Sequence, residues 1–199
     1  AGINKSGNLD VAVIYTKTQA VVAGTFTQNK VAAAPVYVSK EVVATGTAHA
    51  IVANAGCANA CTGQQGLDDA HKMAQIAADE LGVNADDVIV GSTGVIGVSL
   101  PMDKLEAGIK DAVANLSADG SDNAGRAIIT TDTHSKSVTC EFELSGKTVR
   151  MGAIAKGSGM IRPNMATMLC YITTDIAIDQ ALLQKAVSGC VEKSFNMIS

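Results

Sequence analysis

Patterns typical of strands and of helices alternate along this chain, and no low-complexity linker separates them. Such alternation favours one layered domain of the α/β or α+β class, in which helices pack on sheets. β-Branched runs predict strands at 11–15, 35–38, 48–53, 88–90 and 168–172, and a hairpin of 137–144 with 147–154. Apolar residues at intervals of three and four predict helices over 66–81, 101–116 and 182–190.

Composition limits both the core and the partners. Among 199 residues, 47% are apolar but only 3% aromatic, so the core must be built from Ala, Val, Ile and Leu. The net charge of −4, with Lys and Arg scattered, offers no basic surface for nucleic acid or for an anionic membrane. No apolar run approaches the roughly 20 residues of a membrane span. No signal peptide is evident, so a cytoplasmic location is expected.

The five cysteines are expected to be small, buried and reduced, because a chain of this size needs no disulfides. Cys57 and Cys61 are four residues apart, which could suit a metal only with further ligands nearby. His49, His71 and His134 are not at zinc-finger spacing to them. No metal site is therefore predicted.

A Gly- and Pro-containing segment at 156–169 ends in Thr167, directly after Ala166. A threonine hydroxyl is a weak nucleophile unless a base removes its proton. Cleavage of the Ala166–Thr167 bond would supply that base, because it frees the α-amine of Thr167. The residues alone also allow an ordinary threonine at the start of a strand, where its β-branch is favourable.

Several segments, in one consistent order, carry a family resemblance. They are 54–63, 91–97, 130–133, 156–169 and 173–175. Together they resemble the ornithine acetyltransferases, also called glutamate N-acetyltransferases, of arginine biosynthesis. The resemblance runs from the first residues to the last. It implies a layered sandwich of helices over mixed sheets, the fold of ornithine acetyltransferases and related aminopeptidases.

The resemblance also implies roles for individual residues. Thr167 would cleave the chain after Ala166 and then carry the acetyl group, while Thr93 and Gly94 would form the oxyanion hole. Thr130 and Lys156 would contact the substrate together with Thr167.

Plainer interpretations stay open for the same segments. The glycines of 91–97 could merely allow a tight connection between a strand and a helix. Lys156 could be a solvated loop lysine. The neighbours Thr131, Asp132 and Thr133 could be turn-forming groups. Arg162 is equally compatible with substrate contact and exposed surface. Asn54 and Asn59 could line the site or bind loop carbonyls.

The function implied by the resemblance is transfer of the acetyl group of N-acetylornithine to glutamate. No cofactor is expected, although some family members also use acetyl-CoA as a donor. The resemblance divides the sequence into an α-chain region, 1–166, and the start of a β chain, 167–199, in an α2β2 assembly. The sequence is then part of a longer protein. Two alternatives stay open: an aminopeptidase or amidohydrolase with an N-terminal nucleophile, and an inactive fragment.

Overall fold

The computed structural model describes residues 1–4, 7–157 and 168–198. Its strands are β1 Val11–Val21, β2 Thr47–Cys57, β3 Val88–Val95, β4 Lys136–Leu144, β5 Lys147–Lys156 and β6 Leu169–Thr174. Its α-helices are α1 Ala34–Thr45, α2 Gly63–Leu81, α3 Met102–Ala114, α4 Ser121–Ala127 and α5 Gln180–Glu192. Short 3-10 helices span Ala85–Asp87 and Phe195–Met197.

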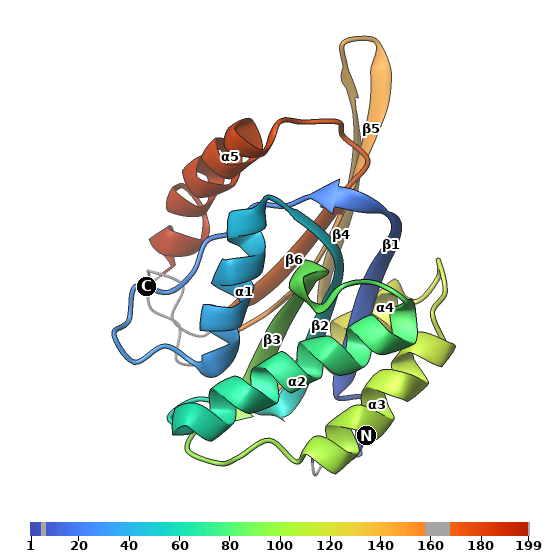
Figure 1. Ribbon diagram of the computed structural model, residues 1–199. Helices are drawn as coiled ribbons and strands as arrows, with labels where there is room; N and C mark the ends of the chain where they lie inside the picture. The colour runs from blue at the N-terminus through green and yellow to red at the C-terminus, as the bar shows by residue number, and fades with distance from the viewer. Residues whose placement is uncertain (5–6, 158–167, 199) are drawn as a thin grey trace.

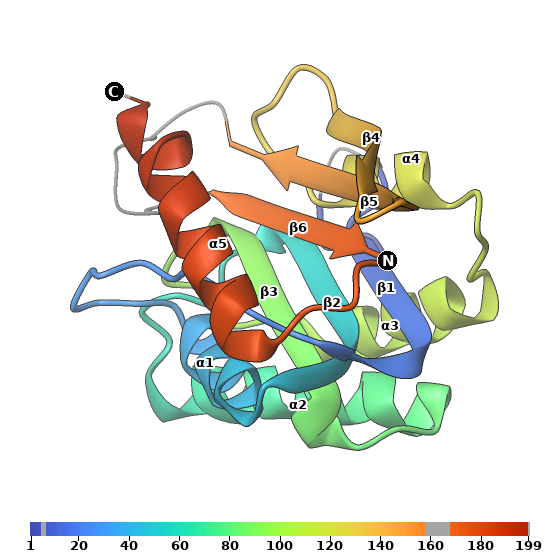
Figure 2. The ribbon, with the colours of Figure 1, turned by 90° about the horizontal axis from the view of Figure 1, so that it is seen from above.

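The strands form two three-stranded sheets (Figure 1). In the first, β2 pairs with β1 in antiparallel fashion and with β3 in parallel fashion. The second, in the order β4-β5-β6, is antiparallel throughout. Figure 2 shows α1, α2 and α3 on one side of the first sheet and the second sheet on its other side. The predicted layered, mixed α/β architecture is confirmed.

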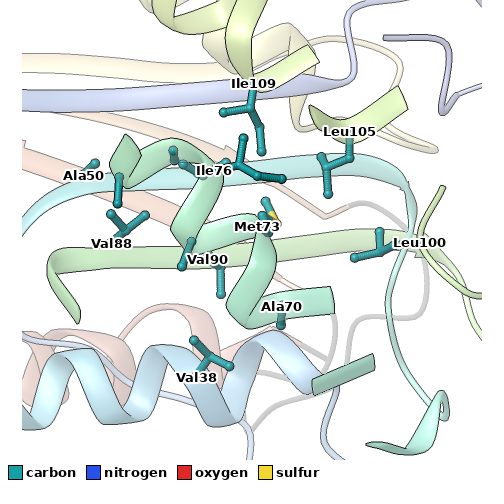
Figure 3. Close-up of a cluster of buried hydrophobic side chains, with 14 of the residues drawn as sticks. Val38, Ala50, Ala70, Met73, Ile76, Val88, Val90, Leu100, Leu105 and Ile109 are labelled. Atoms are coloured by element: carbon teal, nitrogen blue, oxygen red, sulfur yellow. The ribbon is translucent and has the colours of Figure 1, made fainter. Parts of the chain in front are cut away.

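The main core lies between the first sheet and helices α1, α2 and α3 (Figure 3). It consists mostly of Ala, Val, Ile and Leu, as predicted, with Met73 fully buried among them. Helix α2 contributes four buried alanines, whose small side chains permit close packing: Ala70, Ala74, Ala77 and Ala78. A smaller cluster, which joins the first sheet to α4 and β5, contains Ala12, Ala53, Ala127, Ile128 and Ile154.

Most of the predicted elements are present. The helix expected over 66–81 is α2, and it ends at Gly82, whose left-handed conformation (φ +69°) suits glycine. The expected hairpin is β4 and β5, joined through Ser145 and Gly146, both with positive φ. Helices α3 and α5 confirm the other two helical patterns.

The strand predicted at 35–38 is wrong, because these residues belong to helix α1. Pro35 lies in its first turn, where a missing N–H costs nothing. Pro35, Val38 and Val42 are buried on one face of the helix. The buried Ser39 hydroxyl donates to the Val90 carbonyl (2.6 Å) and accepts from the Val90 N–H (3.0 Å), which fixes α1 to β3. Tertiary packing thus overrides the β-propensity of the valines.

Two further expectations need correction. The apolar run 168–172 predicts a strand buried on both sides, but β6 is not, since Ile172 is 50% exposed. All five cysteines are free thiols, but only Cys57 is buried; Cys61, Cys140 and Cys190 are exposed. In the described ranges, no helix combines the length and the apolar character needed to cross a membrane.

Candidate active site

Thr93 and Gly94 lie inside β3, because the strand continues through Val95 and does not end at residue 90 as predicted. Gly94 has a φ of +135°, and a Cβ atom there would lie 2.3 Å from the Gly56 carbonyl carbon. Strand β2 therefore approaches too closely for any side chain at position 94. At Gly91, a Cβ atom would lie 2.0 Å from the hydroxyl oxygen of Tyr171, so β6 of the second sheet approaches there. The glycines thus have a structural role in strand packing, which leaves a catalytic role for the Gly94 N–H open.

Asn54 lies in β2, and Asn59 lies in the connection between β2 and α2. Both side chains are fully buried. Asn54 Nδ2 donates to the Cys57 carbonyl (3.0 Å), and its Oδ1 accepts from the Ser92 hydroxyl (2.7 Å). Asn59 Nδ2 donates to the Gly66 carbonyl (2.8 Å). Both amides thus bind backbone carbonyls, but these carbonyls belong to strand β2 and helix α2 and not to loops as the sequence interpretation expected.

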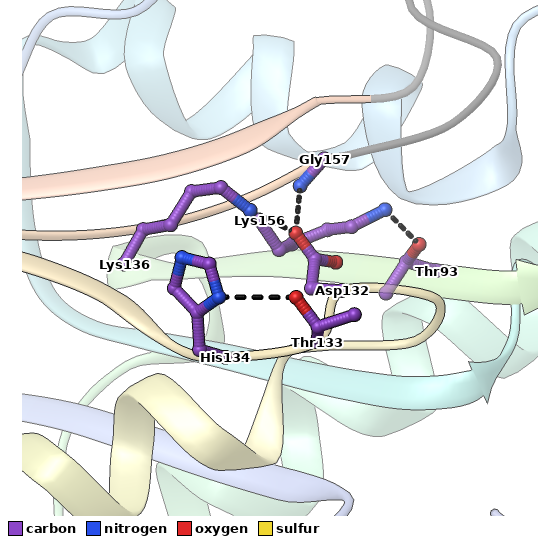
Figure 4. A network of polar contacts seen from close by, with 7 residues as sticks. All are labelled: Thr93, Asp132, Thr133, His134, Lys136, Lys156 and Gly157. Atoms are coloured by element: carbon purple, nitrogen blue, oxygen red, sulfur yellow. Dashed lines mark hydrogen bonds and ion pairs between the residues drawn. The ribbon is translucent and has the colours of Figure 1, made fainter.

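Lys156 is the last residue of β5, and its side chain crosses from the second sheet to the first (Figure 4). Its Nζ donates a hydrogen bond to Thr93 Oγ1 at 2.9 Å. The residue is only 5% exposed, so it is not a solvated loop lysine. Because an ammonium group has only hydrogen-bond donors, Thr93 Oγ1 is the acceptor in this bond. The hydroxyl hydrogen of Thr93 can therefore be donated to another group.

Asp132, in the loop between α4 and β4, has a fully buried side chain. Its Oδ1 accepts from Lys136 Nζ, in an ion pair, and from the Gly157 N–H at 3.0 Å (Figure 4). The turn-forming interpretation is wrong for this residue, because its carboxylate binds the chain 25 residues away, at the end of β5. Residue spacing gave no signal for this contact.

The charges of this cluster influence one another. Burial lowers the pKa of the Lys156 ammonium below its ordinary value; the Asp132 carboxylate opposes this effect, and Lys136 adds to it. Burial acts to raise the pKa of Asp132, but the Lys136 and Gly157 hydrogen bonds and the nearby lysine charges outweigh it, so the pKa is lowered. Asp132 is therefore an anion at neutral pH, and it supports the positive charge on Lys156.

Thr93, Gly94, Thr130, Lys156 and Met168 line one broad groove between the two sheets. Ala166, Thr167 and Arg162 lie outside the described residues. Met168, the covalent neighbour of Thr167, is nevertheless in the groove, and the next residue, Leu169, pairs with Lys156 across β5 and β6. The chain therefore returns from the segment 158–167 beside Lys156.

The groove contains the buried Lys156 ammonium and the Thr93 hydroxyl, whose hydrogen is not used in the bond with Lys156. Gly94, with its backbone N–H, lines the same groove. Hydrogen-bond donors of this kind can stabilise the negative oxygen that develops during acyl transfer. Over residues 1–4, 7–157 and 168–198, no group of three or more His, Cys, Asp or Glu side chains could hold a metal ion.

Comparison with solved structures defines the class of the fold. A TM-score of 0.74 relates the chain to ArgJ from Bacillus halodurans, with 43% identity and coverage of 79% of this chain and 83% of the other. The same score relates it to ornithine acetyltransferase from Mycobacterium tuberculosis in complex with ornithine, with 38% identity and coverage of 83% and 88%. The fold is that of the ornithine acetyltransferase class.

Sequence comparison gives the family. The model of the ArgJ family matches residues 1–199. The arginine biosynthesis bifunctional protein ArgJ of Symbiobacterium thermophilum is 50% identical over 98% of this chain. The glutamate N-acetyltransferase of Methanocaldococcus jannaschii is 48% identical over 98% of it. The chain belongs to the ArgJ family, and it spans about half the length of these relatives (49% of each).

Proposed function

We propose that the protein to which this chain belongs transfers the acetyl group of N-acetylornithine to glutamate, as an enzyme of arginine biosynthesis. The names of its relatives support this activity, and so does the solved ornithine complex. The observation that carries the proposal is the 2.9 Å hydrogen bond from Lys156 to Thr93, in the groove to which the chain returns at Met168. It joins two of the expected site residues across the two sheets.

The proposed reaction uses Thr167 as nucleophile. Its Oγ attacks the acetyl carbonyl of N-acetylornithine, while the freed α-amine of Thr167 takes the hydroxyl proton. The Thr93 hydroxyl and the Gly94 N–H donate to the resulting oxyanion. The C–N bond then breaks, ornithine leaves with the proton, and acetyl-Thr167 remains. The neutral amine of glutamate attacks this ester, gives N-acetylglutamate and returns the proton to Thr167 Oγ.

Cleavage of the chain precedes this reaction in the proposal. Thr167 Oγ attacks the Ala166 carbonyl, the peptide becomes an ester, and water hydrolyses the ester. The products are an α chain that ends at Ala166 and a β chain that starts at Thr167. The coverage values support this step: this chain matches most of each solved chain but only about half of each curated relative. The solved chains are therefore much shorter than those relatives.

The remaining parts of the proposal concern substrates and assembly. Thr130 lines the groove, where it would contact substrate, and Lys156 would hold the substrate carboxylate through its charge. Acetyl-CoA is an additional candidate acetyl donor. The α and β chains would assemble as α2β2 in the cytoplasm. No other cofactor is required by the chemistry.

Replacement of Lys156 removes a buried positive charge, and we expect it to affect the rate of acetyl transfer much more than the stability of the fold. Lys156→Met is expected to lower the rate of acetyl transfer by on the order of 100-fold, because the variant loses an electrostatic contact in the site. Its melting temperature should change by only a few degrees, because relief of the ammonium's desolvation opposes the loss of the Thr93 hydrogen bond and of one supporting charge for Asp132, which keeps Lys136. Steady-state kinetics and thermal unfolding measure the two effects. Lys147→Met, at the exposed start of β5, is the control and should change neither.

The test of the function is an assay of the full-length protein with N-acetylornithine and glutamate. Chromatography should show ornithine and N-acetylglutamate formed in equal amounts. Release of free acetate without N-acetylglutamate would instead indicate a hydrolase, and the proposed transfer would be wrong. Absence of both products with all of the substrates present would indicate an inactive protein.

A further inference from the structure

Asp132 has a carboxylate that the proposed chemistry does not use. Its side chain is fully buried, so it does not touch substrate. Lys136 and Gly157 share one of its oxygens, Oδ1. The other oxygen, Oδ2, is buried without a hydrogen-bond partner among the described residues. An unsatisfied buried acceptor is unfavourable, so simple packing does not explain a charged group at this position.

The contacts of Asp132 converge on the end of β5. Figure 4 shows its carboxylate between Lys136 on one side and the Lys156–Thr93 pair on the other. Gly157, whose N–H donates a hydrogen bond to this carboxylate, is the residue directly after Lys156. Gly157 has a φ of +142°, a backbone conformation that residues with a side chain rarely adopt and that glycine tolerates. One carboxylate thus holds the backbone next to Lys156 and also provides a counter-charge for its ammonium.

We infer that Asp132 is a positioning residue: it fixes the backbone at Gly157, and so directs Lys156 onto Thr93. This inference rests on the proposed function for its effect on cleavage and transfer. The reacting groups are Thr167 and the oxyanion donors, and Asp132 acts on them only through Gly157 and Lys156. Misplacement of such groups by about 1 Å can slow a reaction by about 100-fold.

Two substitutions separate the two contributions of Asp132. Asp132→Ala removes both the acceptor for Gly157 and the charge. Asp132→Asn keeps an oxygen that can accept from Gly157 but removes the charge. It also serves as the second variant if Asp132→Ala fails to fold. Asp175→Ala is the matched control, because the exposed Asp175 accepts the Arg150 N–H (2.8 Å) on the same strand β5.

The first measurement is amide exchange at Gly157. It is made in full-length protein that also carries Thr167→Ala, so that all samples are uncleaved. Asp132→Ala should speed exchange at Gly157 by about tenfold, the effect of one lost charge-assisted hydrogen bond. Asp132→Asn should speed exchange at Gly157 by less than Asp132→Ala does, because its neutral oxygen still accepts from Gly157, although more weakly than a carboxylate. Asp175→Ala should leave exchange at Gly157 within about twofold of the parent. Unchanged exchange in Asp132→Ala would overturn the inference.

The second measurement is the titration of Lys156, followed by NMR of labelled lysine in the same uncleaved background. Among the described residues, Asp132 and Lys136 act on its ammonium through their charges, and the neutral Thr93 hydroxyl accepts its hydrogen bond. Asp132→Asn should lower the pKa of Lys156, because a supporting anion is lost. Lys136→Met should raise the pKa of Lys156, because a repelling cation is lost. A Lys156 pKa that is unchanged in Asp132→Asn would contradict the assigned counter-charge.

The third measurement is the rate of cleavage between residues 166 and 167 in protein with native Thr167, followed by intact mass. Asp132→Ala should be cleaved about 10- to 100-fold more slowly than the parent, while Asp175→Ala should keep the parent rate. Equal rates for the parent and Asp132→Ala would overturn the positioning role alone. A parent that is never cleaved would overturn the proposed function, while exchange at Gly157 and titration of Lys156 would still decide what Asp132 does.

Discussion

The Thr167→Ala variant of the full-length protein is expected to remain one uncut chain and to transfer no acetyl group. Alanine has no hydroxyl to attack the Ala166 carbonyl, so no ester forms and no α-amine is freed. The same loss removes the atom that carries the acetyl group. Both activities should therefore disappear together. Intact-mass analysis and the transfer assay measure them on one preparation.

Thr167→Ser is the matched control, because it keeps the hydroxyl and loses only a methyl group. It should still be cleaved and should retain measurable transfer. The folded state of Thr167→Ala should match that of the uncut parent, as judged by circular dichroism. If Thr167→Ala is still split between residues 166 and 167, the nucleophile is wrongly assigned.

Gly94→Ala is expected to cause the largest loss of stability among single substitutions near the site. The new Cβ atom would lie 2.3 Å from the Gly56 carbonyl carbon and 2.6 Å from the Cys57 nitrogen. Relief of this clash requires β2 and β3 to separate, and the φ of +135° adds strain of about 1–3 kcal/mol. A total of about 3 kcal/mol or more would lower the melting temperature by about 6–12 °C in a chain of this length. Thermal unfolding measures the shift.

Gly97→Ala is the control for backbone strain without a clash. Gly97 lies in the same glycine-rich segment and has a φ of +78°, but a Cβ atom there would meet nothing within 4 Å. Its cost should be limited to the strain of about 1–2 kcal/mol for a left-handed residue. Equal melting temperatures for the two variants would show that strand approach at Gly94 is not what requires glycine.

The elements that the sequence predicts correctly are those whose pattern is local. Helix α2 is evident from its apolar spacing and its terminal Gly82, and the β4–β5 hairpin from the Ser145-Gly146 turn. Helix α1 was missed because its valines favour strands, whereas its packing on β3 depends on contacts such as Ser39 with Val90. The Pro35 signal and the spacing of Pro35, Val38 and Val42 could have indicated a helix.

The candidate site divides in a similar way. Motifs along the sequence single out Thr93, Gly94 and Lys156, and the structure brings these residues into one groove. The sequence does not reveal that Lys156 is buried against Thr93, or that Asp132 binds Gly157, because each contact joins segments far apart in the chain. The roles of all these residues, and of Thr130, Ala166 and Thr167, stay predictions.

The most direct test of the central claim is intact-mass analysis of an active, full-length preparation quenched rapidly after addition of N-acetylornithine. The proposed mechanism predicts two chains, one ending at Ala166 and one beginning at Thr167, with an added acetyl group on the second. Active enzyme that consists of a single chain unbroken between residues 166 and 167 would contradict it.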